Sequence, residues 1–414
     1  MSPRPSVLLV SYHFLPAATP GSRRLDEVAR RLSARGWESL VVTATPARAG
    51  QPEPADYTVV RTTPALSNAT AGPAIASPRV ARVPLLRSLA GFPDKYAPWG
   101  VSLVPSLLSL LRSRPIDVVY SSSPPHSLHL AVANARALKR FPWVAEFRDP
   151  WMFPSRRAPG VLSASVQRAL ERRVLARADR IVVNTPGNLA SLLAANPRLD
   201  PARVRVSTNG YDERLFAADA VAAGPTDSAD ITYVGEIYEG MLAQYARAVA
   251  SIRDRSPSHT PRLAVYGTIH PAERARMQSM GLLPYLDDRG FVSHEESITA
   301  MQRARALLAL LPQEERWRTC VPSKVYWYLA ARRPILAFVP DGDTAVLVRT
   351  LQAGRVFGGD DAAETGRELE TFIMKARAAD APLLSGAGTE RFSMNAIVDD
   401  LDALLREVLR GNSA

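Results

Sequence analysis

Short apolar runs that alternate with loops and helices constrain the fold of this 414-residue chain more than any other feature. Ser6–Ser11 is such a run. A turn-rich loop and an amphipathic stretch over Ser22–Arg35 follow it, and Leu40–Thr43 is the next apolar run. A strand followed by a helix and a second strand forms a right-handed βαβ unit, which requires a parallel sheet. The chain is therefore predicted to be an α/β protein.

The same order recurs in both halves of the chain and predicts a parallel sheet in each. In the first half the further runs are Val118–Tyr120, Trp143–Phe147 and Ile181–Val183, with helices predicted over Leu128–Arg140 and Thr185–Ala195. In the second half the runs are Ile231–Val234, Leu263–Tyr266, Leu307–Leu311 and Ile335–Phe338. Residues 395–410 carry an apolar stripe at helical spacing and are predicted to form the last helix.

The length and a pause in the pattern near Asn209-Gly210 indicate two domains. A chain of 414 residues suits domains of ~100–200 residues each. We predict one domain over residues 1–212, a second over 213–392 and a final helix over 393–414. Residues 46–100 are rich in Pro, Ala and Arg, and we interpret them as an excursion that either shapes a binding site or is partly disordered.

The cysteine content and the apolar runs bear on where the protein works. Cys320 is the single cysteine, which excludes an internal disulfide and makes a reducing cytoplasm the simplest location. The N-terminal residues run directly into an apolar strand without a small-residue cleavage site, so no signal peptide is expected. Val101–Leu111, the best candidate for a membrane span, is too short and contains Pro105. The sequence lacks metal-ligand spacing of Cys and His, and we expect neither a metal nor a cofactor.

Positive charge is concentrated in the first half of the chain. Residues 1–210 contain 28 basic and 12 acidic residues, a net charge of +16, whereas the whole chain has a net charge of +11. Two interpretations remain open: a solvated arginine-rich surface, or peripheral contact with an anionic membrane. The arginines are scattered along helices without interleaved aromatic residues, so nucleic acid is not an expected partner.

The stretch Val321–Phe338 has the features of a phosphate site. Lys324 follows a Pro-Ser turn and precedes a helical run over Val325–Ala331. The N-terminus of a helix presents free backbone N–H groups and a positive dipole end, and a lysine beside it adds a full charge. The segment is therefore predicted to hold a phosphate group.

This stretch resembles the donor-binding segment of the family 4 retaining glycosyltransferases, in which Pro-Ser-Lys is followed by an apolar residue, Tyr, Glu and Tyr-Leu-Ala. The family's Glu is replaced by Trp327 in this chain. The resemblance implies the GT-B fold, in which two doubly wound Rossmann-like domains face a central cleft and the C-terminal helix crosses back to the first domain. It also implies that the first domain is on the acceptor side and that the second binds the nucleotide-sugar donor.

Gly21, Ser22 and Arg23 end a proline-rich loop that follows the first strand. Glycine permits a close approach to the backbone, and serine is a common helix cap. Family 4 members have a similar loop near the donor phosphates and the acceptor. The alternative is an ordinary capped helix.

Polar residues also follow two later strands of the first half. His126 lies in the loop SSSPPHS after the strand ending at Tyr120, where the resemblance implies contact with the transferred sugar. Arg148 and Asp149 follow the next strand in an Arg-Asp-Pro-Trp motif that one branch of the family shares. Asp149 is expected to orient an acceptor hydroxyl, and Arg148 to steady an anionic group. A solvated histidine and a buried Arg–Asp pair are the alternatives.

The remaining donor-binding residues lie in the second half. Gly235 follows a strand and is expected to admit a diphosphate, while Phe291 and Val292 would lie beside the nucleotide base. Family members usually have a Lys or Arg a few residues after this glycine, and Met241 stands near that place in this chain. The donor-binding residues that the resemblance implies are Gly21, Ser22, Arg23, Gly235, Glu236, Phe291, Val292, Arg318, Ser323, Lys324, Tyr326 and Trp327.

The family has a pair of glutamates at two positions where this chain has Thr319 and Trp327. A carboxylate accepts two hydrogen bonds from ribose hydroxyls, whereas an indole only donates. The resemblance implies a metal-independent transfer of a sugar from a nucleotide-sugar to a glycan, lipid-linked or small-molecule acceptor, with retention of the anomeric configuration. The alternatives are a degenerate GT-B binding or scaffold protein and a GT-B enzyme that catalyses a non-glycosidic coupling with an altered donor.

Overall fold

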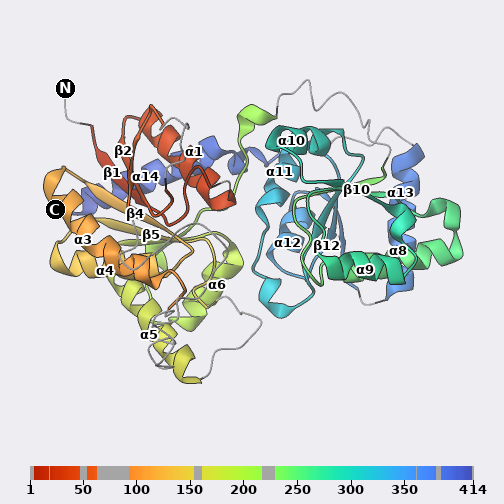
Figure 1. Ribbon diagram of the computed structural model, residues 1–414, viewed down its shortest axis with the longest axis horizontal. Helices are drawn as coiled ribbons and strands as arrows, with labels where there is room; N and C mark the ends of the chain where they lie inside the picture. The colour runs from red at the N-terminus through yellow and green to blue at the C-terminus, as the bar shows by residue number, and fades with distance from the viewer. Residues whose placement is uncertain are drawn as a thin grey trace, which may run out of the picture. The chain divides into compact units, whose positions relative to one another are not determined.

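The chain divides into two α/β units in a computed structural model (Figure 1). The structure describes residues 4–17, 19–46, 54–62, 93–152, 161–216, 229–359, 361–378 and 384–412. One unit comprises Met1–Thr208 together with Ile397–Ala414, and the other comprises Asn209–Ala396. The acceptor-side and donor-side roles predicted for these two parts of the chain stay predictions.

The described part of the first unit contains a seven-stranded parallel sheet in the order β3-β2-β1-β4-β5-β6-β7. The strands are β1 (Ser6–Val10), β2 (Glu38–Thr43), β3 (Thr58–Arg61), β4 (Val118–Ser123), β5 (Trp143–Phe147), β6 (Arg180–Val183) and β7 (Val204–Val206). The helices are α1 (Pro20–Ala34), α3 (Ala97–Ser113), α4 (Ser127–Leu138), α5 (Val161–Arg177) and α6 (Pro186–Ala195). Every residue of β1, β4 and β5 is buried, as expected for central strands of a parallel sheet covered on both faces.

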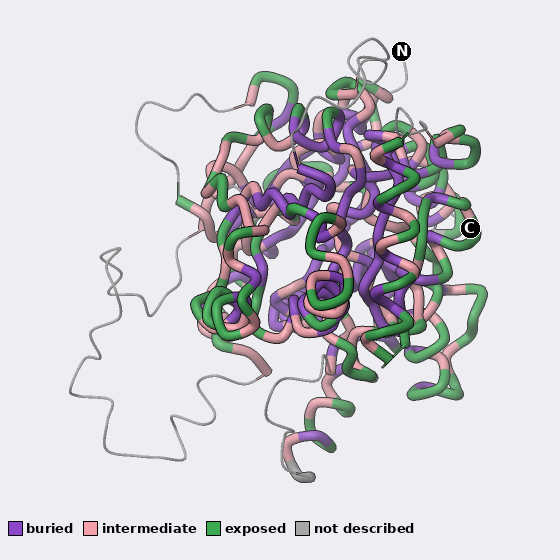
Figure 2. The backbone as a smooth tube through the Cα atoms, turned by 90° about the vertical axis from the view of Figure 1, so that its right-hand side faces the viewer, coloured by how far each residue is buried: buried purple, intermediate pink, exposed green. Residues whose placement is uncertain are grey.

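The second unit repeats this architecture. Its described residues form a six-stranded parallel sheet in the order β10-β9-β8-β11-β12-β13. The strands are β8 (Ile231–Val234), β9 (Leu263–Tyr266), β10 (Leu286–Gly290), β11 (Leu307–Leu310), β12 (Ile335–Phe338) and β13 (Gly354–Phe357). The helices are α8 (Ala243–Arg255), α9 (Pro271–Ser279), α10 (His294–Arg303), α11 (Ser323–Ala331), α12 (Asp343–Thr350) and α13 (Ala362–Ala378). Buried residues, purple in Figure 2, gather in the interior, and exposed residues, green, lie at the periphery. The predicted α/β class with two parallel sheets is confirmed.

The last helix, α14 (Met394–Asn412), belongs to the first unit from Ile397 onward. Within that unit the indole Nε1 of Trp37 donates a hydrogen bond of 2.5 Å to Asp402, and Arg35 forms a 2.6 Å ion pair with Asp399. The apolar stripe of the helix is buried at its centre, where Leu405 is fully enclosed. The predicted return of the final helix to the first domain is therefore confirmed.

The strands that the sequence pattern missed are β3, β7, β10 and β13, and each is an edge strand of its sheet. Edge strands are covered less completely than central ones, so they carry polar residues that interrupt an apolar run. β10, for example, reads LDDRG and contains no fully buried residue.

The segments whose character was uncertain from the sequence are partly described. Residues 46, 54–62 and 93–100 of the predicted excursion include β3 and the start of α3, and residues 47–53 and 63–92 lie outside the described part. The apolar run Val101–Leu111 is the centre of α3, which contains Pro105 and buries Trp99 and Leu103. Among the described helices, none is both long and apolar enough to cross a membrane.

Candidate functional site

Three segments of the first unit meet at Arg148, which follows the central strand β5. Its Nε donates a hydrogen bond of 3.0 Å to the carbonyl oxygen of Ser123, the last residue of β4. Its guanidinium also lies against Gly21 in the first turn of α1, because a Cβ added to Gly21 would lie 2.0 Å from Nη1. Gly21 thus permits a side chain to approach the start of the helix, and the structure brings two of the predicted motifs together.

A buried ion pair lies close enough to Arg148 to affect its charge. Glu146, the fourth residue of β5, is 2% exposed and forms a 2.9 Å ion pair with Arg24 of α1. It also accepts a hydrogen bond of 2.5 Å from Ser122. Burial alone would raise the pKa of Glu146, but the charges of Arg24 and Arg148 and the hydrogen bonds from Ser122 and Tyr120 together hold this pKa below its usual value. The carboxylate is therefore ionised, binds Arg24 directly and attracts Arg148 through its charge.

His126 is held in a defined orientation at the start of α4. Its Nε2 lies 3.3 Å from the carbonyl oxygen of Pro150, which assigns the ring proton to this nitrogen. Its ring stacks on Trp151 with centroids 5.0 Å apart and an interplanar angle of 19°. Burial lowers the pKa of His126 to about 4, so the ring is neutral near pH 7. Its Nδ1, an acceptor in this tautomer, is buried and has no hydrogen-bond partner among the described residues.

The other predicted residues of the first unit have different surroundings. Ser22 is buried, and its backbone N–H donates a hydrogen bond of 3.1 Å to Oγ1 of Thr19. Thr19 therefore caps the helix, and the prediction that Ser22 does so is wrong because the helix begins earlier, at Pro20. Burial lowers the pKa of Arg23, which is half-buried, whereas Asp149 is exposed. The loop predicted after Tyr120 begins later, since β4 continues to Ser123.

In the second unit, Lys324 extends from the first turn of α11 over the turn that follows β8. Its Nζ donates a hydrogen bond of 2.5 Å to the hydroxyl of Tyr233 and lies 4.0 Å from the centre of that ring. A Cβ added to Gly235 would lie 2.8 Å from Nζ, and the φ of Gly235, +112°, favours glycine. Burial lowers the pKa of Lys324 to about 7, an effect that the charge of Glu236 opposes. The structure thus brings two predicted donor-binding residues into contact.

The N-terminus of α11 adds hydrogen-bond donors to this place. Pro322 occupies the cap position and provides no side-chain hydrogen bond to the helix, which begins at Ser323. The first N–H groups of a helix lack partners inside the helix. These donors lie in the same turn as Lys324, which is about half protonated near pH 7. Tyr326, the fourth residue of α11, is instead buried in the core beside Phe392, with ring centroids 5.1 Å apart.

Trp327 lies in an aromatic cluster of the second unit. Its ring centroid is 4.7 Å from that of His294 and 6.1 Å from that of Phe216. The side chain is partly buried and packs at the margin of the core. Trp327 therefore fills space that the shorter side chain of a glutamate would leave open.

Glu236 is joined to Lys324 through Tyr233, whose hydroxyl donates a hydrogen bond of 2.8 Å to the carbonyl oxygen of Glu236. In the described part of the chain, the remaining predicted donor-binding residues of this unit form no hydrogen bond or ion pair with Lys324. Arg318 is exposed and donates a 2.7 Å hydrogen bond to the carbonyl oxygen of Asp341. Glu236 is exposed, Phe291 is 87% exposed and Val292 is half-buried. The exposed side chains of Arg318, Glu236 and Phe291 are accessible to a ligand.

A comparison with family models covers the motifs of the first unit around Gly21, His126 and Arg148. Residues 21–215 match the model of Glycosyltransferase Family 4. The chain is a GT-B protein with a family 4 domain. A search of curated proteins gave no match.

Solved structures resemble this GT-B protein along its whole length. Sucrose-phosphate synthase from Thermosynechococcus elongatus is 16% identical, with a TM-score of 0.67, and the match covers 99% of this chain and 100% of the synthase chain. The lipopolysaccharide outer core galactosyltransferase WaaB is 13% identical, with a TM-score of 0.63 and coverage of 97% and 99%. UDP-GlcNAc 2-epimerase from Methanocaldococcus jannaschii is 11% identical, with a TM-score of 0.53 and coverage of 97% and 99%. At these identities the likeness shows the fold.

The family 4 domain also contains residues that the motifs did not single out. Glu146 was passed over as part of an apolar strand, although a carboxylate inside a buried run is a signal of a buried ion pair. Its partner Arg24 is 122 residues away in the sequence, and nothing local predicts the pairing. Among the described residues, no cluster of three or more His, Cys, Asp or Glu side chains is suited to a metal ion.

Proposed function

We propose that this GT-B protein is a glycosyltransferase that moves a sugar from a nucleotide-sugar donor to an acceptor with retention of the anomeric configuration. The acceptor is a glycan, a lipid-linked molecule or a small molecule. The observation that carries the proposal is the position of Lys324, which lies against Gly235 and beside the uncapped N-terminus of α11.

This arrangement suits the charge that develops when a nucleotide-sugar reacts. As the bond between the sugar and the diphosphate breaks, negative charge accumulates on the diphosphate oxygens. A lysine ammonium and the N–H groups of a helix N-terminus stabilise that charge without a metal ion. The glycine at Gly235 keeps the turn free of a side chain, so a diphosphate can approach the lysine closely.

In the first unit we assign three residues to the sugar and the acceptor. The unpartnered Nδ1 of His126 accepts a hydrogen bond from a hydroxyl of the transferred sugar. Arg148 interacts with an anionic group, and the exposed carboxylate of Asp149 orients an acceptor hydroxyl. The buried Glu146 holds Arg148 in place by its charge.

Trp327 favours a second candidate, a GT-B protein that binds a ligand without transferring a sugar. Its indole cannot accept the two hydrogen bonds that ribose hydroxyls offer to a carboxylate. Met241, near the place of the family's second cation, is buried and its sulfur accepts a hydrogen bond from the backbone N–H of Tyr238. Both features are consistent with an altered or an unused donor pocket.

A thermal-shift panel with UDP, GDP, ADP, CDP and dTDP tests the transferase proposal. We expect one of these nucleotides to raise the melting temperature of the wild type and of Lys375→Ala, which removes an exposed lysine of α13. The same nucleotide should not stabilise Lys324→Ala. Absence of any shift in the wild type would refute the proposal.

Two further measurements separate the candidates once a nucleotide binds. Release of the nucleotide from its sugar conjugate, followed by chromatography, supports the transferase, whereas binding without turnover supports the second candidate. Trp327→Glu should weaken binding if the indole contacts the nucleotide. Equal or tighter binding would show that Trp327 only fills the pocket.

We also propose that the protein works in the cytoplasm at the surface of an anionic membrane. The net charge of +16 over residues 1–210 supports the contact, and the single cysteine is consistent with a reducing compartment. Sedimentation with anionic vesicles tests the contact, since electrostatic binding weakens as salt is added. No sedimentation at low salt would exclude it.

A further inference from the structure

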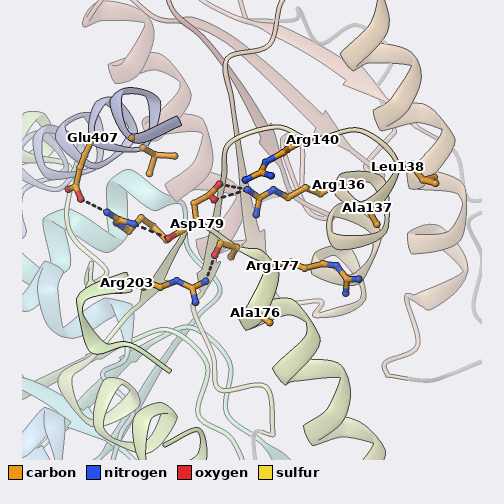
Figure 3. A pocket seen from close by; sticks show the side chains of 13 residues that line it. Arg136, Ala137, Leu138, Arg140, Ala176, Arg177, Asp179, Arg203 and Glu407 are labelled. Atoms are coloured by element: carbon orange, nitrogen blue, oxygen red, sulfur yellow. Dashed lines mark hydrogen bonds and ion pairs between the residues drawn. The ribbon is translucent and has the colours of Figure 1, made fainter. Parts of the chain in front are cut away.

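The first unit contains an arginine-lined pocket at the end of its sheet opposite to Arg148 (Figure 3). This pocket has a volume of about 840 Å³ and lies where α4, α5 and α14 end and where β6 begins. Arg148 follows the carboxyl end of β5, whereas Arg180 begins β6 at its amino end. Parallel strands of four or five residues separate these two edges by roughly 13–17 Å. The pocket is therefore distinct from the candidate site.

The charges around the pocket are unequal. Five arginines line it, against two carboxylates: Arg136, Arg140, Arg177, Arg180 and Arg203, with Asp179 and Glu407. The excess of three positive charges is partly offset by the negative dipole ends of three helices, each equivalent to about half a charge. A positive excess remains, and it favours an anionic ligand.

Three of these arginines form the walls of the pocket. Arg136 makes a 2.7 Å ion pair with Asp179, and Arg180 makes one of the same length with Glu407. Arg203 donates a hydrogen bond of 2.8 Å to a carbonyl oxygen near the end of α5. The contacts of Arg136 with Asp179 and of Arg180 with Glu407 are drawn as dashed lines in Figure 3. All three contacts fix the walls and use only part of the donor capacity of the guanidinium groups.

The unused donors point to a ligand. Within the described ranges, the side chains of Arg140 and Arg177 make no hydrogen bond or ion pair. The Nε of Arg180 is buried and also has no hydrogen-bond partner there. A buried donor without a partner carries a desolvation cost that a ligand oxygen would remove. Arginine forks match the oxygens of phosphate groups in particular.

We propose that this pocket binds a phosphate group, carried either by a phospholipid headgroup or by a small soluble phosphate. Leu138, which is 72% exposed, lines the same pocket and provides an apolar contact beside the arginines. The proposal does not depend on glycosyl transfer, because the pocket shares no residue with the candidate site.

Pyrophosphate titration and vesicle sedimentation test the proposal with a double variant, Arg140→Ala and Arg177→Ala. Neither side chain makes a hydrogen bond or ion pair in the described chain, so the variant should fold normally. Circular dichroism checks the fold. The matched control is Arg247→Ala with Arg303→Ala, which removes two exposed arginines of the second unit. All proteins also carry Lys324→Ala, so that pyrophosphate bound at the proposed donor site does not contribute.

We expect the double variant to lose at least tenfold in affinity and the control to stay within twofold of its parent. Loss of pyrophosphate binding indicates a soluble phosphate. Loss confined to vesicles of phosphatidylglycerol, with pure phosphatidylcholine as the reference, indicates a headgroup. The proposal is overturned if the parent binds neither probe, or if the double variant binds as well as the control.

Discussion

Because burial lowers the pKa of Lys324 to about 7, the binding of a nucleoside diphosphate should depend on pH in the physiological range. Only the protonated lysine supplies the positive charge, and its protonated fraction falls from about nine-tenths at pH 6 to about one-tenth at pH 8 for a pKa of about 7. If the neutral lysine does not bind the ligand, the affinity falls about tenfold across these two units, or about 1.4 kcal/mol. The sign is fixed by the charge: binding is tighter at the lower pH.

Isothermal titration at pH 6, 7 and 8 measures this dependence, with the best nucleotide of the thermal-shift panel. Lys324→Arg is the matched control because arginine stays charged over the whole range. The diphosphate itself also titrates near pH 6, and that contribution is common to both proteins. The ratio of the two affinities therefore reports Lys324 alone. A ratio that does not change between pH 6 and pH 8 would refute the role assigned to this lysine.

Three further predictions concern the first unit. Gly21→Ala should leave the free energy of unfolding within about 1 kcal/mol of the wild type, since alanine favours the helix, yet lower the transfer rate because its Cβ displaces Arg148. Glu146→Gln leaves Arg24 buried without its countercharge and should cost about 3–5 kcal/mol in urea unfolding. His126 must charge in the unfolded chain before it does in the folded one, so stability should fall from pH 6.5 toward pH 4, and His126→Gln should reduce this fall by up to about 3 kcal/mol.

Matched variants check these three predictions. Gly411→Ala, at a helix position where an added Cβ meets nothing within 4 Å, should keep full activity. Glu315→Gln breaks an exposed ion pair with Arg318 and should cost less than about 1 kcal/mol. Equal losses from Glu315→Gln and Glu146→Gln would contradict the assigned burial of the Arg24 pair. A pH profile that His126→Gln leaves unchanged would contradict the low pKa of His126.

The sequence predicted the central strands well because they are buried on both faces. β5 and β12 have the predicted bounds, and both consist of residues that a parallel sheet encloses. The edge strands β7 and β13 escaped prediction because their exposed residues break the apolar pattern. The local apolar pattern thus predicts the central strands of each sheet and misses the edge strands.

Within the candidate site, the sequence predicted only those residues that stand next to the end of a strand or the start of a helix. Arg148 and Lys324 were found because they adjoin a strand end and a helix start. Their contacts with Gly21 and Gly235 join residues about 90 to 130 positions apart, which no local pattern reveals. The helix cap was also predicted wrongly. Because proline is accepted in the first turn of a helix, α1 begins at Pro20, and its cap is Thr19, three residues before the predicted Ser22.

The return of α14 to the first unit has a consequence for the order of synthesis. Ile397–Ala414 complete the first unit, but the ribosome makes them after the whole of Asn209–Ala396. The indole of Trp37 donates a hydrogen bond to Asp402, which is synthesised 365 residues later. The nascent first unit therefore presents an incompletely covered surface while the second unit is being translated. Its last cooperative folding step follows the emergence of α14 from the ribosomal tunnel.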